Sequence, residues 1–541
     1  MKLRLVSAFV LAVLGAAQTQ AYAQGLKPPT LSFAQADWGA ALAALPNVDA
    51  LGPTAMAMRT RTAQVGPGGP IAPALTRLNG AMAPRMVGIA SSPVPVLLPF
   101  DVETLLRDQA NGTADDSNER YLGGFHAAQF FYAGPAGYDA AFAIRTTQVP
   151  ELSDISFSRP IEVQISGSSV LYELDTPITM TGDPVPALEN EFPGIRRLRL
   201  ERYLRYTFVR FGVPYVASVL CFDSGVSREG LPTCRAADRV LLRFLRALRV
   251  AGGMPNGLRP AKPLPVERPA AVSNTFGYFA PGLILSGSGS RKRVGRADHT
   301  VYSQIRFPLA DAAAHAGSEM FPLDQHGPGP VSADGTARIV YPWRDNFCER
   351  RSFAVAQCPA GHGHQGQDIR PMQCTRLPGT DRCERYGEVL AVRGGIIMRS
   401  PKQEAAYLIV NSANEHIRFR YLHMSPRKMD ADGLLSGRRV HEGEVIGEVS
   451  NYSMQEAGTS YHLHFDIQVP TKDGWVFVNP YMTLVASYER LIGAHGTELA
   501  DPTAMNSAVT DWGSSAAEAA REQPKRRTSK VRKPARRNDK R

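Results

Sequence analysis

The pattern of hydrophobic and polar positions divides the chain into two parts that predict different mixtures of helices and strands. From 24 to about 253, runs rich in β-branched and aromatic residues predict strands over 160–174 and 206–223. The segments 31–45 and 234–250 carry the helical period instead. One face of the second predicted helix is apolar and comprises Val240, Leu241, Phe244, Leu245 and Leu248. We therefore expect an α+β domain over 24–253, whose role stays open because it contains no chemical motif.

A Pro-rich stretch at 254–272 has the composition of a linker, and we expect 254–337 to be a Pro/Gly-rich connecting segment. From 338 to 490, short apolar runs alternate with glycines, as in 406–412 and 443–450. That texture predicts a mainly antiparallel β-sheet domain. Seven of the twelve histidines lie between His362 and His464, so any histidine chemistry is expected in this domain.

The segment 461–469, YHLHFDIQV, alternates apolar and polar residues without interruption. Because side chains alternate between the two faces of a strand, one face is expected to be core, and His462 and His464 share the other. The two imidazoles would then be about 7 Å apart along the strand. That spacing suits one histidine that binds a metal and a neighbour that acts on the metal's bound water. The alternative is a pair of exposed polar positions on a half-buried strand.

The segment 416–424, HIRFRYLHM, follows the same rule. His416 is an even number of positions from Arg418 and Arg420, so the three side chains share one face of the strand. Because two of them are arginines, we predict that this face meets solvent. His423 lies at an alternate position on the other face of the strand, with the apolar residues, so we expect it to be partly buried. A buried polar group such as its imidazole needs a hydrogen-bond partner. We therefore expect His423 to be functional, and His416 and His441 to lie on the surface.

The segment 361–371, GHGHQGQDIRP, offers an imidazole and a carboxylate at His364 and Asp368, with Gly366 between them allowing a close backbone approach. Two neutral histidines and one aspartate would leave a Zn²⁺ site with a net positive charge and an open fourth position, as in catalytic zinc sites. No H-E-x-x-H sequence occurs, which excludes the helix-based metalloprotease arrangement.

Together these segments resemble the lysostaphin-type (LytM-like) zinc peptidases, which cut peptidoglycan cross-links. The resemblance covers roughly 340–488 and has five elements in order: the H-x-G-x-D of His364 to Asp368, Tyr421-x-His423, the turn at 437–447, the H-x-H-F of His462 to Phe465, and Asn479-Pro480. It implies that His364, Asp368 and His464 bind one Zn²⁺ and that His423 and His462 are catalytic. Residues 459–461 depart from the Thr-Gly-Pro that is usual in the family.

The N-terminus changes the expected compartment. Residues 1–23 combine Lys2 and Arg4, an apolar run and a small-x-small ending, which is typical of a cleaved secretory signal peptide. No later apolar stretch is long enough to predict a transmembrane helix in the mature chain. We therefore expect a periplasmic or cell-envelope protein.

Six cysteines in an exported chain favour disulfides, and short loops favour the pairs Cys221–Cys234, Cys348–Cys358 and Cys374–Cys383. The alternative is a Cys/His zinc cluster around 361–368, which is disfavoured because no C-x-x-C pair is present.

The formal net charge of +11 lies almost entirely in the signal peptide and in 521–541, where eleven basic and two acidic residues stand. The rest of the chain is nearly neutral, so nucleic acid is not an expected partner. We expect 491–541 to be a tail, disordered from about 521, whose basic end either contacts acidic envelope surfaces or has no partner.

The sequence therefore predicts an exported zinc endopeptidase that acts on the peptide cross-links of peptidoglycan. Two alternatives stay open. One is a non-catalytic LytM-type regulator or binding protein, whose groove is filled by its own N-terminal region. The other is a zinc peptidase that acts on proteins.

Overall fold

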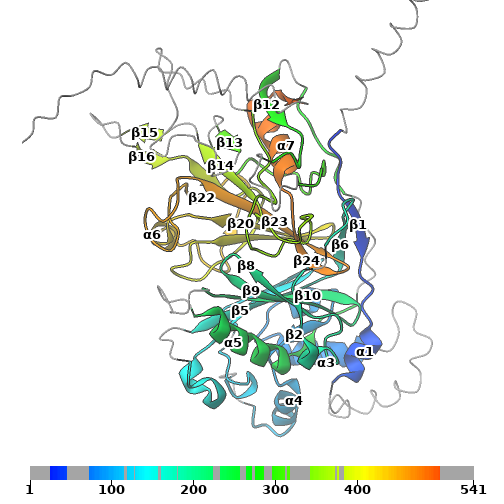
Figure 1. Ribbon diagram of the computed structural model, residues 1–541. Helices are drawn as coiled ribbons and strands as arrows, with labels where there is room; N and C mark the ends of the chain where they lie inside the picture. The colour runs from blue at the N-terminus through cyan, green and yellow to red at the C-terminus, as the bar shows by residue number, and fades with distance from the viewer. Residues whose placement is uncertain are drawn as a thin grey trace, which may run out of the picture. The chain divides into compact units, whose positions relative to one another are not determined.

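The computed structural model describes residues 25–45, 72–114, 119–126, 128–155, 160–179, 181–222, 232–255, 263–270, 274–284, 295–310, 314–316, 342–371, 374–376 and 383–499 (Figure 1). The predicted signal peptide, much of the predicted connecting segment and the basic end of the chain lie outside these ranges. Within them, no helix has the length and apolar character needed to cross a bilayer.

The N-terminal part is built on a seven-stranded antiparallel sheet. Its order is β3 (Phe130–Gly134), β4 (Gly137–Ile144), β5 (Ile161–Ser168), β10 (Val213–Leu220), β9 (Tyr203–Arg210), β8 (Arg196–Leu200) and β7 (Asp183–Pro184). Helices α3 (Ala72–Met82), α4 (Val102–Ala110) and α5 (Cys234–Ala247) lie on one side of it (Figure 1). The predicted α+β architecture of this part is confirmed.

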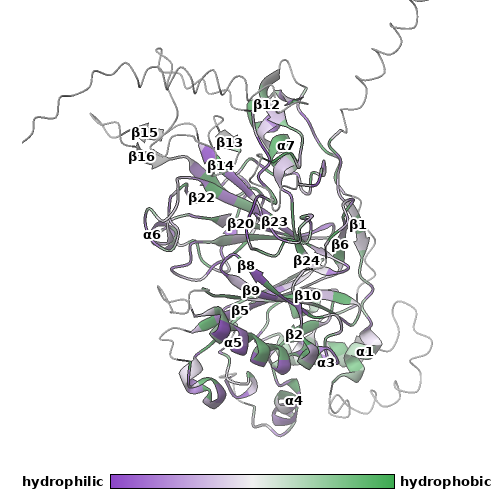
Figure 2. Ribbon diagram, in the orientation of Figure 1, coloured by the Kyte–Doolittle hydropathy of each residue, from purple (hydrophilic) through white to green (hydrophobic). Residues whose placement is uncertain are grey.

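Helix α5 follows the predicted amphipathic pattern. Thr233 caps its N-terminus, and the five apolar positions of its predicted face are all buried. Hydrophobic and hydrophilic residues both mark this helix in Figure 2, as expected for a helix that covers a sheet. The helix predicted over 31–45 is shorter in the structure. Strand β1 (Thr30–Phe33) pairs with β6 (Val170–Glu173), and only α1 (Trp38–Ala43) is helical, with Asp37 as its cap.

The second sheet is also antiparallel. Its order is β13 (Ala314–Ala316), β14 (Gln367–Pro371), β23 (Leu463–Thr471), β20 (Glu415–Leu422), β19 (Ala406–Ser412), β18 (Gly395–Met398) and β21 (Arg439–Val440), and β24 (Gly474–Val478) also pairs with β23. Two helices accompany it, α6 (Pro426–Ala431) and α7 (Tyr481–Ile492). The predicted β-rich domain is confirmed.

Four further two-stranded sheets complete the described strands. They are β11 (Arg249–Gly252) with β2 (Val96–Leu98), β12 (Asn274–Phe279) with β25 (His495–Leu499), β15 (Cys374–Arg376) with β16 (Cys383–Tyr386), and β17 (Glu388–Leu390) with β22 (Val445–Glu448). Ordered structure therefore continues to Leu499, beyond the start predicted for the tail.

The two large sheets stack face to face through polar side chains. On β20, Arg418 donates to Asp139 of β4 at 2.7 Å, and His416 reaches the same carboxylate at 3.0 Å. On β23, Gln468 accepts from Arg205 of β9. The other face of β23 is the apolar core predicted for it, with Leu463, Phe465, Ile467 and Val469 fully buried.

The prediction that His416, Arg418 and Arg420 face solvent is therefore wrong, since each is at most 1% exposed. The alternation assigned their face correctly, but the N-terminal sheet covers that face. His441 lies on the surface as predicted.

The predicted disulfides Cys221–Cys234 and Cys348–Cys358 are confirmed. Because Cys348 and Cys358 are bonded to each other, they are not available to the alternative zinc cluster. The pairing Cys374–Cys383 stays a prediction, because those side chains lie outside the described part of the chain.

Candidate metal centre

Three of the predicted site residues meet where β14 and β23 pair. Asp368 on β14 lies directly opposite His464 on β23 in the antiparallel register. His364 precedes β14 in a loop that returns its imidazole to the same point. In this structure His364 Nε2, His464 Nδ1 and Asp368 Oδ1 form a candidate metal-binding group, and all three residues are at most 4% exposed.

The loop before β14 is held by covalent and backbone contacts. The Cys348–Cys358 disulfide lies beside it, and Cys348 and His364 are joined by a backbone hydrogen bond of 3.0 Å. Gly366 passes so close to β23 that an added Cβ would lie 2.4 Å from the Phe465 carbonyl oxygen. The predicted close approach at Gly366 is therefore present, and no side chain fits there without a shift of the backbone.

The separations of the three donor atoms fit a tetrahedral zinc ion. His364 Nε2 lies 2.9 Å from His464 Nδ1 and 3.4 Å from Asp368 Oδ1, and His464 Nδ1 lies 3.3 Å from Asp368 Oδ1. Tetrahedral zinc with bonds of about 2.0–2.1 Å places its ligand atoms roughly 3.3 Å apart. Two nitrogens and one carboxylate oxygen are also donors that zinc prefers, and three protein ligands leave a fourth position for water or substrate.

Each candidate ligand is oriented by a second hydrogen bond. His364 Nδ1 lies 3.0 Å from the Asn346 carbonyl oxygen, and His464 Nε2 lies 3.2 Å from an Asp466 carboxylate oxygen. The Asn346 amide donates to the second oxygen of Asp368 at 3.2 Å. Such partners fix the tautomer of a ligating histidine and raise its basicity, as is usual at protein zinc sites.

The structure also brings His423 and His462 to this centre. Their ring centroids are 4.8 Å apart, and His462 Nε2 lies 3.5 Å from Asp368 Oδ1. His462 Nδ1 bonds the Ser460 carbonyl at 2.8 Å, and His423 Nδ1 bonds the Tyr452 carbonyl at 3.0 Å. A carbonyl can only accept, so Nδ1 carries the proton in both rings, and Nε2 is the basic nitrogen of each neutral imidazole.

His423 reaches the centre because the backbone changes direction at that residue. Strand β20 ends at Leu422, which lies opposite His464, and His423 follows with a φ of 72°. This left-handed conformation is uncommon for a residue with a side chain and breaks the alternation on which the prediction rested. The sequence placed His423 on the apolar face of its strand and for that reason predicted it to be functional. In the structure its side chain lies beside the polar face.

Burial and mutual contacts determine the charges at the centre. Burial opposes ionisation of Asp368, but His364 and His462 outweigh it and hold the pKa of Asp368 well below its usual value. Burial disfavours the charged form of His464, while the hydrogen bonds that it donates to Asp368 and Asp466 outweigh burial and raise the pKa of His464 to about 9. Burial, assisted by His462, lowers the pKa of His423 well below its usual value, so His423 is neutral at pH 7.

Three charged residues near the centre were not predicted. Arg420 lies 3.4 Å from His464 Nε2 and is paired with Asp466. Asp466 is two positions after His464 on β23, so the alternation of the strand could have predicted that it lies here. Glu201, in the turn between β8 and β9, lies 3.6 Å from Arg420. Burial opposes ionisation of Glu201, but His464 and Arg420 outweigh it and lower its pKa to about 2. Nothing in the sequence near Glu201 signals this contact.

Residues 375–480 match the sequence model of the family described as Peptidase family M23. The chain carries an M23 (LytM-type) domain. The matched segment includes His423, His462 and His464 but begins after Asp368. The contribution of His364 and Asp368 to this M23 domain therefore rests on the register of β14 with β23 and on the distances above.

Two solved structures are similar to parts of the chain. One, from Ruminococcus gnavus, is assigned as a glycyl-glycine endopeptidase LytM, with 20% identity, a TM-score of 0.18, and 25% of this chain and 50% of that chain covered. The other is Helicobacter pylori Csd3, with 10% identity, a TM-score of 0.14, and 64% and 57% covered. The chain therefore spans about half the length of the Ruminococcus gnavus protein and just over half the length of Csd3. A search of curated protein sequences gave no match.

Proposed function

We propose that the protein is a zinc metalloendopeptidase that hydrolyses peptide cross-links of peptidoglycan. The observation that carries the proposal is the geometry of the centre: three donor atoms spaced for zinc, with two further histidines directed at the same point. The M23 match supports peptide-bond hydrolysis as the reaction. The glycyl-glycine endopeptidase assignment of the Ruminococcus gnavus protein is in keeping with a cell-wall substrate.

His364, Asp368 and His464 would hold the zinc ion, which supplies Lewis acidity and lowers the pKa of a bound water. His423 is neutral at pH 7 and presents Nε2, so it can accept a proton from an attacking water and later return it to the leaving amine. His462, whose Nδ1 is held by Ser460, also presents a basic Nε2; once Nε2 has taken up a proton, it can donate to the oxygen on which negative charge develops. The carbonyls of Tyr452 and Ser460 thus position both rings for proton transfer.

The test is release of peptide fragments from purified cell wall by the full chain, analysed by mass spectrometry. We expect fragments from the metal-loaded protein, none after chelation, and recovery when zinc is added back. A soluble protein substrate serves as the comparison, because cleavage of protein but not of cell wall would favour a general zinc peptidase instead.

One observation favours the non-catalytic alternative. The four site histidines and Asp368 are at most 7% exposed, and their face of the sheet is covered by N-terminal strands. A substrate can reach the centre only if the covering part moves or leaves an approach at its edge. Zinc retention without any release of cell-wall peptides would support a LytM-type regulator or binding protein.

We also propose export across the inner membrane and a cell-envelope location, supported by the leader-like residues 1–23. The basic residues beyond Arg521 would add contact with acidic envelope material. Fractionation of cells tests the location. Binding of the full and truncated chains to cell wall at low and high salt tests the tail, whose contribution should fall as salt rises.

A further inference from the structure

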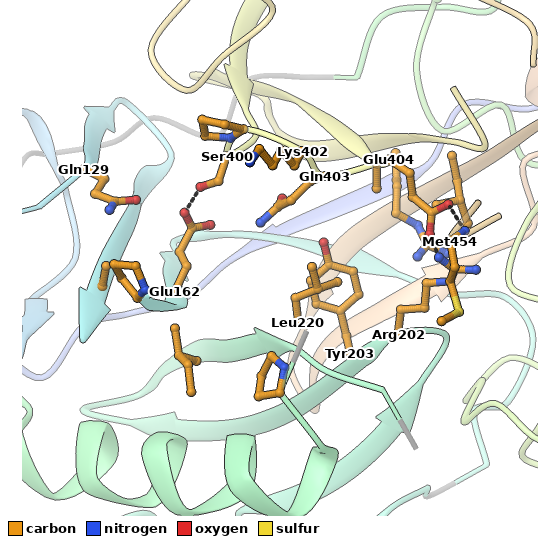
Figure 3. A pocket seen from close by; sticks show the side chains of 18 of the residues that line it. Gln129, Glu162, Arg202, Tyr203, Leu220, Ser400, Lys402, Gln403, Glu404 and Met454 are labelled. Carbon is orange, nitrogen blue, oxygen red and sulfur yellow. Dashed lines mark hydrogen bonds and ion pairs between the residues drawn. The ribbon is translucent and has the colours of Figure 1, made fainter. Parts of the chain in front are cut away.

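A pocket lies between the two parts of the chain (Figure 3). Its volume is about 360 Å³, within the size range of small-ligand sites. One wall comes from strands of the N-terminal sheet and includes Glu162 and Tyr203. The opposite wall comes from the segment 400–405 of the second part. We call this space the interface pocket.

The interface pocket contains a carboxylate with no positive partner in the described part of the chain. Glu162 of β5 accepts hydrogen bonds from Gln164 at 3.1 Å and from the Ser400 hydroxyl, both of them neutral. Burial raises the pKa of Glu162, as expected for a carboxylate that lacks a nearby cation. An ionised carboxylate in such a place favours a cationic ligand, because a buried charge is costly unless it is paired.

A second acceptor in the pocket is unsatisfied. The Gln403 side-chain oxygen is buried, and no donor reaches it within the described residues. Most buried polar atoms in proteins have a hydrogen-bond partner, so this atom indicates a missing donor. Figure 3 shows Gln403 between Glu162 and Tyr203, and these side chains face one space.

Two of the three cations that line the pocket are already engaged. Arg202 pairs with Glu404 and donates to Ser453 at 2.7 Å, and Arg420 pairs with Asp466. The third, Lys402, is exposed, and its backbone amide, not its ammonium, donates to the Asp430 carboxylate. Glu162 and the Gln403 side-chain oxygen therefore have no charged donor in the described part of the chain, and an ammonium would complement both.

The pocket adjoins the groups assigned to catalysis. Leu422, the residue before His423, lines it, and so does Tyr452, whose carbonyl accepts from His423 Nδ1. Arg420 lines it as well and lies 3.4 Å from His464. A peptide that placed its scissile bond at the centre would have its adjacent segment at this pocket.

We propose that the interface pocket is a subsite for an ammonium-bearing segment of the peptide substrate, with Glu162 and Gln403 as the recognition groups. The inference rests on the proposed function and makes the N-terminal sheet half of the substrate site. Apolar neighbours such as Leu220 and Ile161 would contact the hydrocarbon that carries the amine.

The test measures binding separately from hydrolysis. The full chain, freed of metal by chelation, is titrated calorimetrically with a short synthetic peptide carrying one free side-chain amine, and with the same peptide acetylated on that amine. We expect the free amine to bind at least about tenfold more tightly, since hydrogen bonds to charged groups contribute more than neutral ones. Equal affinity for the two peptides, or no binding of either, would overturn the proposal.

Glu162→Gln keeps the size of the side chain and removes its charge, and its amide can still accept from Gln164 and donate to the Ser400 hydroxyl, so it should abolish the preference for the free amine. Glu173→Gln is the matched control, because Glu173 is exposed on β6 and does not line the pocket. Gln403→Leu should weaken binding of the free amine without creating a preference for the acetylated peptide. Retention of the full preference in Glu162→Gln would contradict the assignment, provided that its melting temperature equals that of the control.

The zinc-loaded wild-type protein is assayed for cleavage of both peptides and of cell wall. Amine-selective binding without cleavage of any substrate would contradict the proposed function but support the subsite. Cleavage of cell wall without amine selectivity would support the function and refute the subsite. The two proposals can therefore fail separately.

Discussion

The imidazole of His416 on β20 lies 3.0 Å from the carboxylate of Asp139 on β4, although the two residues are 277 positions apart in the sequence. Arg418 donates two hydrogen bonds to the same carboxylate, at 2.7 and 3.1 Å. All three side chains are at most 1% exposed. The N-terminal sheet is thus joined to the M23 sheet by a buried charged cluster.

Removal of Asp139 should destabilise the protein strongly. Asp139→Ala would leave the Arg418 guanidinium buried without its counter-charge, and breaking a buried ion pair in this way costs about 3–5 kcal/mol. The measurement is the free energy of unfolding from urea denaturation. Asp154→Ala, at an exposed ion pair with Arg239, should produce little change. Similar stabilities for the two variants would contradict the role assigned to the cluster.

The same carboxylate should make the stability depend on acid. Burial opposes ionisation of Asp139, but Arg418 and His416 outweigh it and hold its pKa below the usual value. The unfolded chain therefore binds more protons than the folded one as pH falls. The contribution is complete above the unfolded-state pKa of about 3.9 and is lost below it. Unfolding free energies measured from about pH 6 to pH 3 should fall less steeply for Asp139→Asn than for the wild type.

The alternation of β23 was sufficient to predict much of the site. In 461–469 it separates the core positions from the polar ones, and it places His462 and His464 on one face. The sequence could not reveal what covers that face, because a strand of alternating polarity looks the same whether its polar side meets water or a second polar sheet. His416 was therefore assigned to the surface, and it is fully buried.

Contacts that depend on tertiary approach were also beyond prediction. Glu201 reaches Arg420 only because the β8–β9 turn extends to the metal centre. The φ of 72° at His423 is equally invisible in the alternation, since parity arguments assume an unbroken strand. The local disulfides were predictable because their cysteines are only 13 and 10 positions apart.

Loss of the Cys348–Cys358 disulfide should weaken the metal centre as well as the fold. This bond restrains the chain that carries His364 and Asn346, and removal of such a cross-link typically costs about 2–4 kcal/mol of stability. The double variant Cys348→Ser/Cys358→Ser should lower both the melting temperature and the zinc content of the folded protein.

The matched control is Cys221→Ser/Cys234→Ser, which removes the disulfide at the start of α5. It should lower the melting temperature but leave the zinc content of the folded protein unchanged. If both double variants retained zinc equally, the disulfide at the loop would have no particular role at the centre.

The last prediction separates the two histidines that β23 places side by side. His464 offers Nδ1 to the candidate metal position, so His464→Ala should abolish both zinc retention and hydrolysis. His462 is not in the metal-binding group and is oriented by Ser460, so His462→Ala should keep near-stoichiometric zinc and lose turnover by roughly 100-fold or more. The control is His441→Ala, because His441 is exposed, whereas His416 is buried against Asp139 and its loss would destabilise the fold. Metal analysis and cleavage assays on the three purified variants decide the assignment. Loss of zinc in His462→Ala with retention of zinc in His464→Ala would reverse the two roles. Retention of zinc and activity in both variants would exclude a metal centre at this position.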